Sequence, residues 1–196
     1  MARPARPLFG YALLGDFMEE LVSVSNTNLQ METTIKDPPA VLHEAKGFVL
    51  ASWENITVCV WMTQATVPLC NKLDEFSALF VKAHPEGISS IHIIGNGAQL
   101  PGAPARLRLD EITKRYALDL ACVGTVLEGA GFWMSAFLSF MTGIHRLSNR
   151  PFKSYTCTSI REIAAWVPSH HAMRTGTKIA DKDLEQVLRH LRMRHP

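Results

Sequence analysis

The stretch GFVLASWENITVCVWM, residues 47–62, indicates how the sheet of this protein begins. Its two halves, residues 47–53 and 56–62, are rich in β-branched and aromatic residues, and a polar Glu54-Asn55 corner separates them. Residues of this kind favour strands, and a short polar pair between two such runs favours a tight turn. The pattern therefore predicts a β-hairpin.

Helix and strand patterns alternate after this hairpin. Pro68 suits the first position of a helix, which is predicted to end at His84-Pro85 and to carry an apolar stripe of Leu69, Leu73, Phe76 and Phe80. Further strands are predicted at residues 90–94, 118–127 and 152–157, with helices at 107–116 and 131–146 between them. Alternation of this kind favours an α/β fold, in which helices pack on a mixed, mostly parallel sheet.

Two helices are expected to end the chain. Ser159 and Glu162 form a capping-box pattern at the start of the first, and Pro168 is expected to stop it. Polar residues 169–178 then predict a linker. The second helix is expected to be capped by Asp181, and its apolar residues at helical spacing are Leu184, Val187, Leu188 and Leu191.

The chain has 196 residues, of which 47% are hydrophobic and 19% are charged, as expected for a single folded domain. Residues 41–168 are predicted to form the α/β domain. Residues 1–40 are predicted to be an arm with one short helix, which either packs on the domain or docks to a partner. Residues 169–196 are predicted to be a linker and an amphipathic helix.

Charge and hydropathy argue against nucleic-acid binding, a transmembrane helix and a secretory signal. A formal net charge of +2 gives no electrostatic reason to expect a nucleic acid. The most apolar stretch, residues 129–144, is shorter than the roughly 20 residues that a transmembrane helix needs. Acidic residues interrupt the segment where a secretory signal would lie, so a cytoplasmic location is expected.

Three stretches carry a resemblance to a known family. They are the hairpin at residues 47–62, LDLACVGTVLEGAGFWMSAFLSFMTGIHRL at 118–147, and PFKSYTCTSIREIAAWVP at 151–168. Over residues 44–168 the chain resembles the STAS-like domains of bacterial anti-sigma-factor antagonists, and especially the small STAS/SEC14-like proteins. The resemblance implies a bacterial regulatory domain that binds other proteins.

One departure from that family concerns its phosphorylation switch. The resemblance places the phosphorylated Ser at the start of the helix after the strand at residues 90–94. Here the corresponding stretch, GNGAQLPGAPARLRLDE at residues 95–111, contains no Ser or Thr. A phosphorylation switch at this position therefore lacks its acceptor hydroxyl.

Motifs for catalysis, cofactors and metals are weak throughout the sequence. No Ser lies in a G-x-S-x-G motif. Gly95-x-Gly97 has Leu100 where a dinucleotide-binding motif has its third glycine. The four cysteines form no C-x-x-C pair and are expected to be buried thiols. His170-His171 are adjacent, so they point in different directions, and a solvated loop is expected there. We therefore expect no enzyme activity, cofactor or metal.

The helix predicted at residues 131–146 carries the candidate interaction surface, because it is apolar nearly all round and must be covered on both sides. Its cover is expected to be the arm or the last helix, a second copy of the chain, a partner protein or an apolar ligand. The surface residues are Phe132, Trp133, Met134, Phe137, Phe140, Met141 and Ile144.

These features predict a non-catalytic interaction, regulatory or scaffold module that self-associates through apolar helix surfaces. The alternative is a binding protein for an apolar or lipid-like small ligand. Arg189, Arg192 and Arg194 on the last helix leave contact with an acidic partner or a membrane surface open.

Overall fold

The computed structural model describes residues 37–129, 137 and 151–194, which all belong to one compact unit spanning residues 35–196. Its sheet has six strands in the order β1-β2-β3-β4-β5-β6. They are β1 (Ala40–Ala45), β2 (Phe48–Trp53), β3 (Ile56–Trp61), β4 (Ile88–Ile94), β5 (Leu120–Leu127) and β6 (Lys153–Cys157). The strands β1 to β3 are antiparallel and β3 to β6 are parallel, which confirms the predicted hairpin and the mixed sheet.

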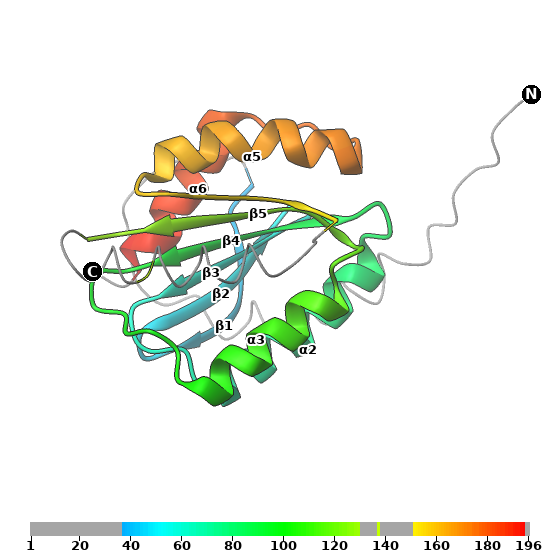
Figure 1. Cartoon of the computed structure of the whole chain (residues 1–196). Helices are drawn as coiled ribbons and strands as arrows, with labels where there is room; N and C mark the ends of the chain where they lie inside the picture. The colour runs from blue at the N-terminus through cyan, green and yellow to red at the C-terminus, as the bar shows by residue number, and fades with distance from the viewer. Residues whose placement is uncertain (1–36, 130–136, 138–150, 195–196) are drawn as a thin grey trace, which may run out of the picture. The chain divides into compact units, whose positions relative to one another are not determined.

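Helices lie on both faces of this sheet (Figure 1). The described helices are α2 (Val67–Ala83), α3 (Ala103–Arg115), α5 (Ile160–Thr175) and α6 (Asp181–Met193). One face carries α5 and α6, and the other carries α2 and α3 (Figure 1). The α/β fold predicted from the alternation is therefore confirmed.

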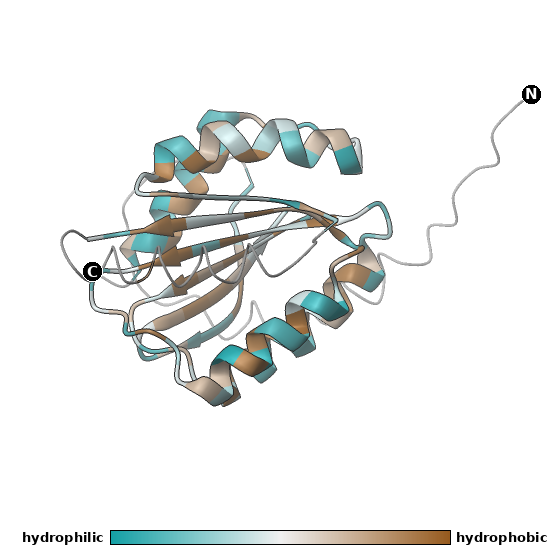
Figure 2. Ribbon diagram, in the orientation of Figure 1, coloured by the Kyte–Doolittle hydropathy of each residue, from teal (hydrophilic) through white to brown (hydrophobic). Residues whose placement is uncertain are grey.

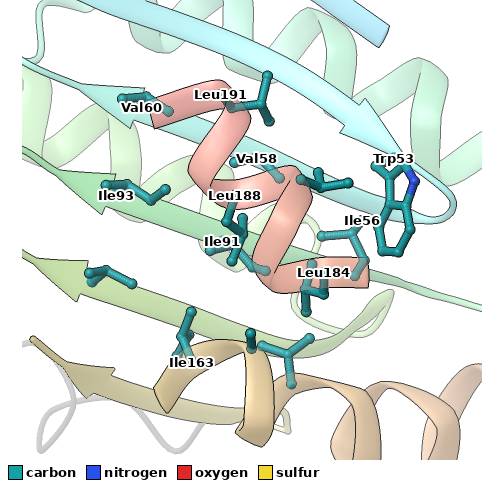
Figure 3. Close-up of a cluster of buried hydrophobic side chains, with 14 of the residues drawn as sticks. Trp53, Ile56, Val58, Val60, Ile91, Ile93, Ile163, Leu184, Leu188 and Leu191 are labelled. Carbon is teal, nitrogen blue, oxygen red and sulfur yellow. The ribbon is translucent and has the colours of Figure 1, made fainter. Parts of the chain in front are cut away.

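The face under α5 and α6 is an aliphatic core. Alternate residues of β3 and β4 point to it, as expected from the two-residue period of a strand. Leu184, Leu188 and Leu191 of α6 pack onto these residues, and Ile163 of α5 joins them (Figure 3). The central strands are mainly hydrophobic, whereas the helices alternate hydrophobic and hydrophilic residues (Figure 2). This face therefore stabilises the domain chiefly by burying aliphatic side chains.

Gly124 of β5 allows α5 to approach the sheet closely. A Cβ atom at this position would lie 2.8 Å from Cγ1 and 2.9 Å from Cδ1 of Ile163, which is fully buried. We expect Gly124→Ala to lower the free energy of unfolding by about 2 kcal/mol, because the added methyl overpacks the core. Ile163→Val removes Cδ1, so the double variant is expected to lose less than the sum of the two single losses in urea denaturation. Strictly additive losses would contradict this packing.

The strand β1 was not predicted. It pairs with β2 through a tight connection that includes Gly47 at φ +74°. The segment follows Pro38-Pro39 and includes His43 and Glu44, so its sequence lacks the alternation of a half-buried strand. Hydrogen bonding to β2 makes it a strand, and the arm predicted for residues 1–40 overlaps its first residue.

The prediction that Pro168 stops the helix was wrong. Although Pro168 has no backbone N–H to donate, α5 continues to Thr175 and ends at Gly176, whose φ is +76°. Burial of Val167 and His171 on either side of the proline holds the helix to the sheet. The linker therefore begins only after Thr175, and His170-His171 lie in a helix rather than in a solvated loop.

The predicted helix caps also differ in the structure. Ser159 is the N-cap of α5, but its side chain makes no capping hydrogen bond, and the Glu162 carboxylate instead accepts a hydrogen bond from Tyr155. Ala180, rather than Asp181, is the N-cap of α6. Both helices are stabilised mainly by burial, so side-chain caps are dispensable here.

Candidate functional site

A cavity of about 180 Å³ lies between the sheet and the helices α2 and α3, and it is partly open to solvent. The sheet contributes residues of β3, β4 and β5 to its wall, and α2 and α3 contribute Leu73, Leu109 and Ile112. Its exposed lining residues are Thr63, Gln99 and Arg106, which lie just beyond the carboxyl ends of β3 and β4 and in the first turn of α3. The cavity therefore opens at the carboxyl edge of the parallel strands, where ligands commonly bind in α/β folds.

The cavity face of the sheet is polar at its centre, unlike the aliphatic face under α5 and α6. Thr57, Ser90, His92 and Thr125 all line the cavity. Thr57 is in register with Ser90, and His92 is in register with Thr125, so these side chains are neighbours on one face. Apolar burial alone does not explain such a cluster, because buried polar groups require partners.

Hydrogen bonds determine which nitrogen of the His92 ring carries the proton. The indole Nε1–H of Trp61 donates to Nδ1 of His92 across 3.3 Å, and the two rings are 16° from parallel with centroids 6.5 Å apart. An indole N–H only donates, so Nδ1 must be unprotonated and the proton is on Nε2. Nε2 lies 3.1 Å from Oγ of Ser90 and therefore donates to it.

His92 is also neutral at physiological pH. Burial lowers the pKa of His92 to about 4. A proton on Nδ1 would also face the indole N–H of Trp61, so two donors would oppose each other. The order of donation is Trp61 to His92 to Ser90, and the hydroxyl proton of Ser90 has no acceptor within the described part of the chain. His92 cannot accept that proton in this arrangement, so it does not activate Ser90 as a nucleophile.

Two more hydroxyl groups in the cavity wall are buried and have no partner among the residues that the structure describes. Thr125 is 3% exposed and Ser77 of α2 is 7% exposed, and both line the cavity. Neither side chain makes a hydrogen bond within the described part of the chain, whereas the Thr57 hydroxyl donates to the carbonyl of Ser89. A buried hydroxyl without a partner is costly unless water or a ligand satisfies it.

A charged cluster joins α2 to α3 beside the cavity. Asp74 of α2 accepts hydrogen bonds from Arg108 at 2.5 Å, Arg115 at 2.6 Å and Tyr116 at 2.9 Å. Burial alone would raise the pKa of Asp74, but the Tyr116 hydrogen bond and the charges of Arg115 and Arg108 hold this pKa below its usual value. The cluster fixes the two helices that form one wall of the cavity.

A second histidine lies on the opposite face of the sheet. His171 of α5 is fully buried, accepts a hydrogen bond at Nδ1 from Ser89 at 2.8 Å and donates from Nε2 to Asn55 at 2.6 Å. Cys122 lies 3.2 Å from the Ser89 hydroxyl. Although the order Ser-His-Asn resembles that of a hydrolase triad, Ser89 is fully buried and does not line the cavity, so this network is structural.

Of the seven residues in the predicted interaction surface, the structure describes only Phe137. This side chain is 4% exposed and lines the cavity. The other six, Phe132, Trp133, Met134, Phe140, Met141 and Ile144, lie outside the described residues, so the surface stays a prediction. The cavity residues were not predicted, although alternation of Ser90 and His92 with the apolar residues Ile91 and Ile93 in ISSIHII was a signal for them.

Other sequence features have structural explanations. All four cysteines are buried thiols, as predicted, and burial raises the pKa of Cys70 and Cys122 to about 11. A Cβ at Gly95 would lie 2.2 Å from the sulfur of Met62, so the flexible Met62 side chain would have to shift to accommodate any other residue here. Within residues 37–129, 137 and 151–194, no three His, Cys, Asp or Glu side chains gather as a metal site would require. Over the same residues, every helix is too short or too polar to span a membrane.

Comparison with known proteins gives no match to a family model, to a curated protein or to a solved structure. The STAS-like resemblance therefore stays a prediction.

Proposed function

We propose that this protein binds a small, mostly apolar molecule in the cavity between its sheet and the helices α2 and α3. The observation that carries this proposal is the coexistence of an apolar cavity with the hydroxyls of Thr125 and Ser77, which are buried and have no partner among the described residues. A folded domain is stabilised by filling its cavities and pairing its buried polar groups. A bound molecule with an apolar body and a polar group does both.

The size of the cavity limits the ligand. A cavity of roughly 150 Å³ in another protein accommodates benzene. The present cavity of about 180 Å³ suits a single aromatic ring with a short substituent, or a short aliphatic chain. This size favours a small ligand over the two-chain lipid that a lipid carrier would hold.

The interaction module predicted from the sequence remains a separate proposal. It depends on apolar residues of which only Phe137 is described, and Phe137 lines the cavity. Ligand binding has direct support from the described residues and is therefore the leading proposal.

Filling the cavity tests ligand binding. We expect toluene to raise the melting temperature of the wild-type protein and to shift the NMR signals of methyl groups in the cavity wall. Ser77→Leu places an isobutyl group in the cavity, so it is expected to abolish both effects while stabilising the unliganded protein by about 1 kcal/mol.

Ala78→Leu is the matched control, because Ala78 is the next residue of α2 and is exposed. This variant is expected to bind toluene as the wild type does. No binding of toluene or of any other single-ring compound by the wild type, or equal binding by Ser77→Leu, would exclude this cavity as the site.

A further inference from the structure

We infer that Ser90 recognises an uncharged hydrogen-bond acceptor on the ligand, such as a carbonyl oxygen, and that His92 and Trp61 orient its hydroxyl group for this purpose. This inference rests on the proposed function, since it assigns a ligand class to the same cavity. It is independent of the shape of the ligand's apolar part.

The hydroxyl group of Ser90 can still donate one hydrogen bond to a ligand. Its oxygen accepts the proton from Nε2 of His92 at 3.1 Å, and Ser90 makes no other hydrogen bond within the described residues. The side chain is 9% exposed and lines the cavity. The Ser90 hydroxyl proton is therefore available to a molecule bound in the cavity. Only a hydrogen-bond acceptor on that molecule can pair with it.

His92 and Trp61 are positioning residues, because they act through Ser90. If His92 carried its proton on Nδ1, its Nε2 would accept the Ser90 proton and the cavity would present an oxygen lone pair instead. The indole N–H of Trp61 prevents that tautomer by donating to Nδ1 at 3.3 Å. A tryptophan at this position thus determines that the site donates a hydrogen bond.

The neighbouring hydroxyls complete the polar end of the site. His92 is in register with Thr125, whose buried hydroxyl also lines the cavity and has no hydrogen-bond partner among the described residues. Thr57, in register with Ser90, donates to the carbonyl of Ser89 at 3.3 Å and has no proton left to offer. Among these neighbours, Ser90 is the one whose donor is both oriented and uncommitted.

A pair of ligands of the same shape isolates this hydrogen bond. Acetophenone has a carbonyl oxygen where α-methylstyrene has a methylene group. We expect wild-type protein to bind acetophenone about tenfold more tightly than α-methylstyrene, as one hydrogen bond to an uncharged group supplies. The infrared carbonyl stretch of bound acetophenone is expected to lie below its value in an apolar solvent.

Three variants test the roles of the individual residues. Ser90→Ala is expected to abolish the preference for acetophenone and the infrared shift, and to bind α-methylstyrene as before. Thr57→Val also removes a hydroxyl from the cavity wall, but that hydroxyl already donates to the carbonyl of Ser89. This variant is expected to keep both the preference for acetophenone and the infrared shift. Trp61→Phe is expected to weaken the preference although Ser90 is present, because His92 would then populate both tautomers. ¹⁵N NMR should show this mixture, rather than the proton on Nε2 alone.

The outcomes separate this inference from the proposed function. If neither ligand binds to the wild type, the proposed function fails. If both bind with equal affinity, or if wild-type His92 carries its proton on Nδ1, the inference about Ser90 fails and the cavity remains a site for apolar molecules. An infrared shift that survives in Ser90→Ala would also overturn the assignment.

Discussion

Replacing His171 with alanine is expected to lower the free energy of unfolding at pH 7 by about 4 kcal/mol. The substitution leaves the Ser89 hydroxyl without its acceptor and the Asn55 side-chain oxygen without its donor, and it opens a void beneath α5. Each buried polar group left unpaired costs roughly 1–3 kcal/mol, and the void adds to this cost. Urea denaturation at pH 7 measures the loss.

The pH dependence of stability gives a second signature of His171. Burial first of all lowers the pKa of His171 to about 4, from 6.5 for an exposed histidine. As the pH falls below 6.5, the unfolded chain therefore takes up a proton before the folded chain does. The stability contributed by the neutral histidine is complete above pH 6.5 and declines as the pH falls to 4, by about 3 kcal/mol at 1.36 kcal/mol per pKa unit.

The His171→Ala variant lacks this acid-dependent component, so its stability should fall less steeply between pH 6.5 and 4. The variant retains the contribution of His92, whose pKa is lowered by burial in the same direction. His170→Ala is the matched control, since His170 is the adjacent residue, is only half-buried and stacks on Trp166 with ring centroids 4.2 Å apart. The network would be refuted if the two alanine variants had the same stability and the same pH profile.

Replacing Asp74 with alanine is expected to lower the free energy of unfolding by about 3 kcal/mol. The Asp74 side chain is 10% exposed and joins Arg108, Arg115 and Tyr116 to α2. Removing one partner of a buried ion pair typically costs roughly 3–5 kcal/mol, and the low end applies because both arginines reach solvent. Since α2 and α3 hold one wall of the cavity, the variant should also bind toluene more weakly than the wild type.

Acid should reproduce part of this effect. The lowered pKa of Asp74 means that its stabilising contribution is complete above about pH 4 and is lost as the pH falls through the pKa of the folded state. Glu75→Ala is the control, because Glu75 is exposed and pairs at the surface with Lys72 on the same helix. This change is expected to stay within about 0.5 kcal/mol of the wild type. If Asp74→Ala lost as little stability as this control, the cluster would not be what joins the two helices.

The predicted elements were correct where local sequence alone decides them. The hairpin of β2 and β3 and the strands β4 and β5 were expected from runs of apolar and β-branched residues, and the helices α2 and α6 from apolar residues at helical spacing. The end of α5 was wrong, since Pro168 weakens a helix locally and burial of Val167 and His171 outweighs that local cost. The edge strand β1 was missed because pairing with β2 makes it a strand.

The candidate site required the tertiary structure. The sequence alone determined the fold class, the buried cysteines and the lack of a phosphorylatable residue between Gly95 and Glu111. Only the folded chain places Trp61 of β3 beside His92 of β4, and brings Ser77 of α2 and Thr125 of β5 to the wall of one cavity, because strand register and helix packing join residues that are far apart in sequence. A hydroxyl can bind a ligand when its neighbours do not accept its proton, and strand pairing in the sheet, rather than the local sequence, determines which residues those neighbours are.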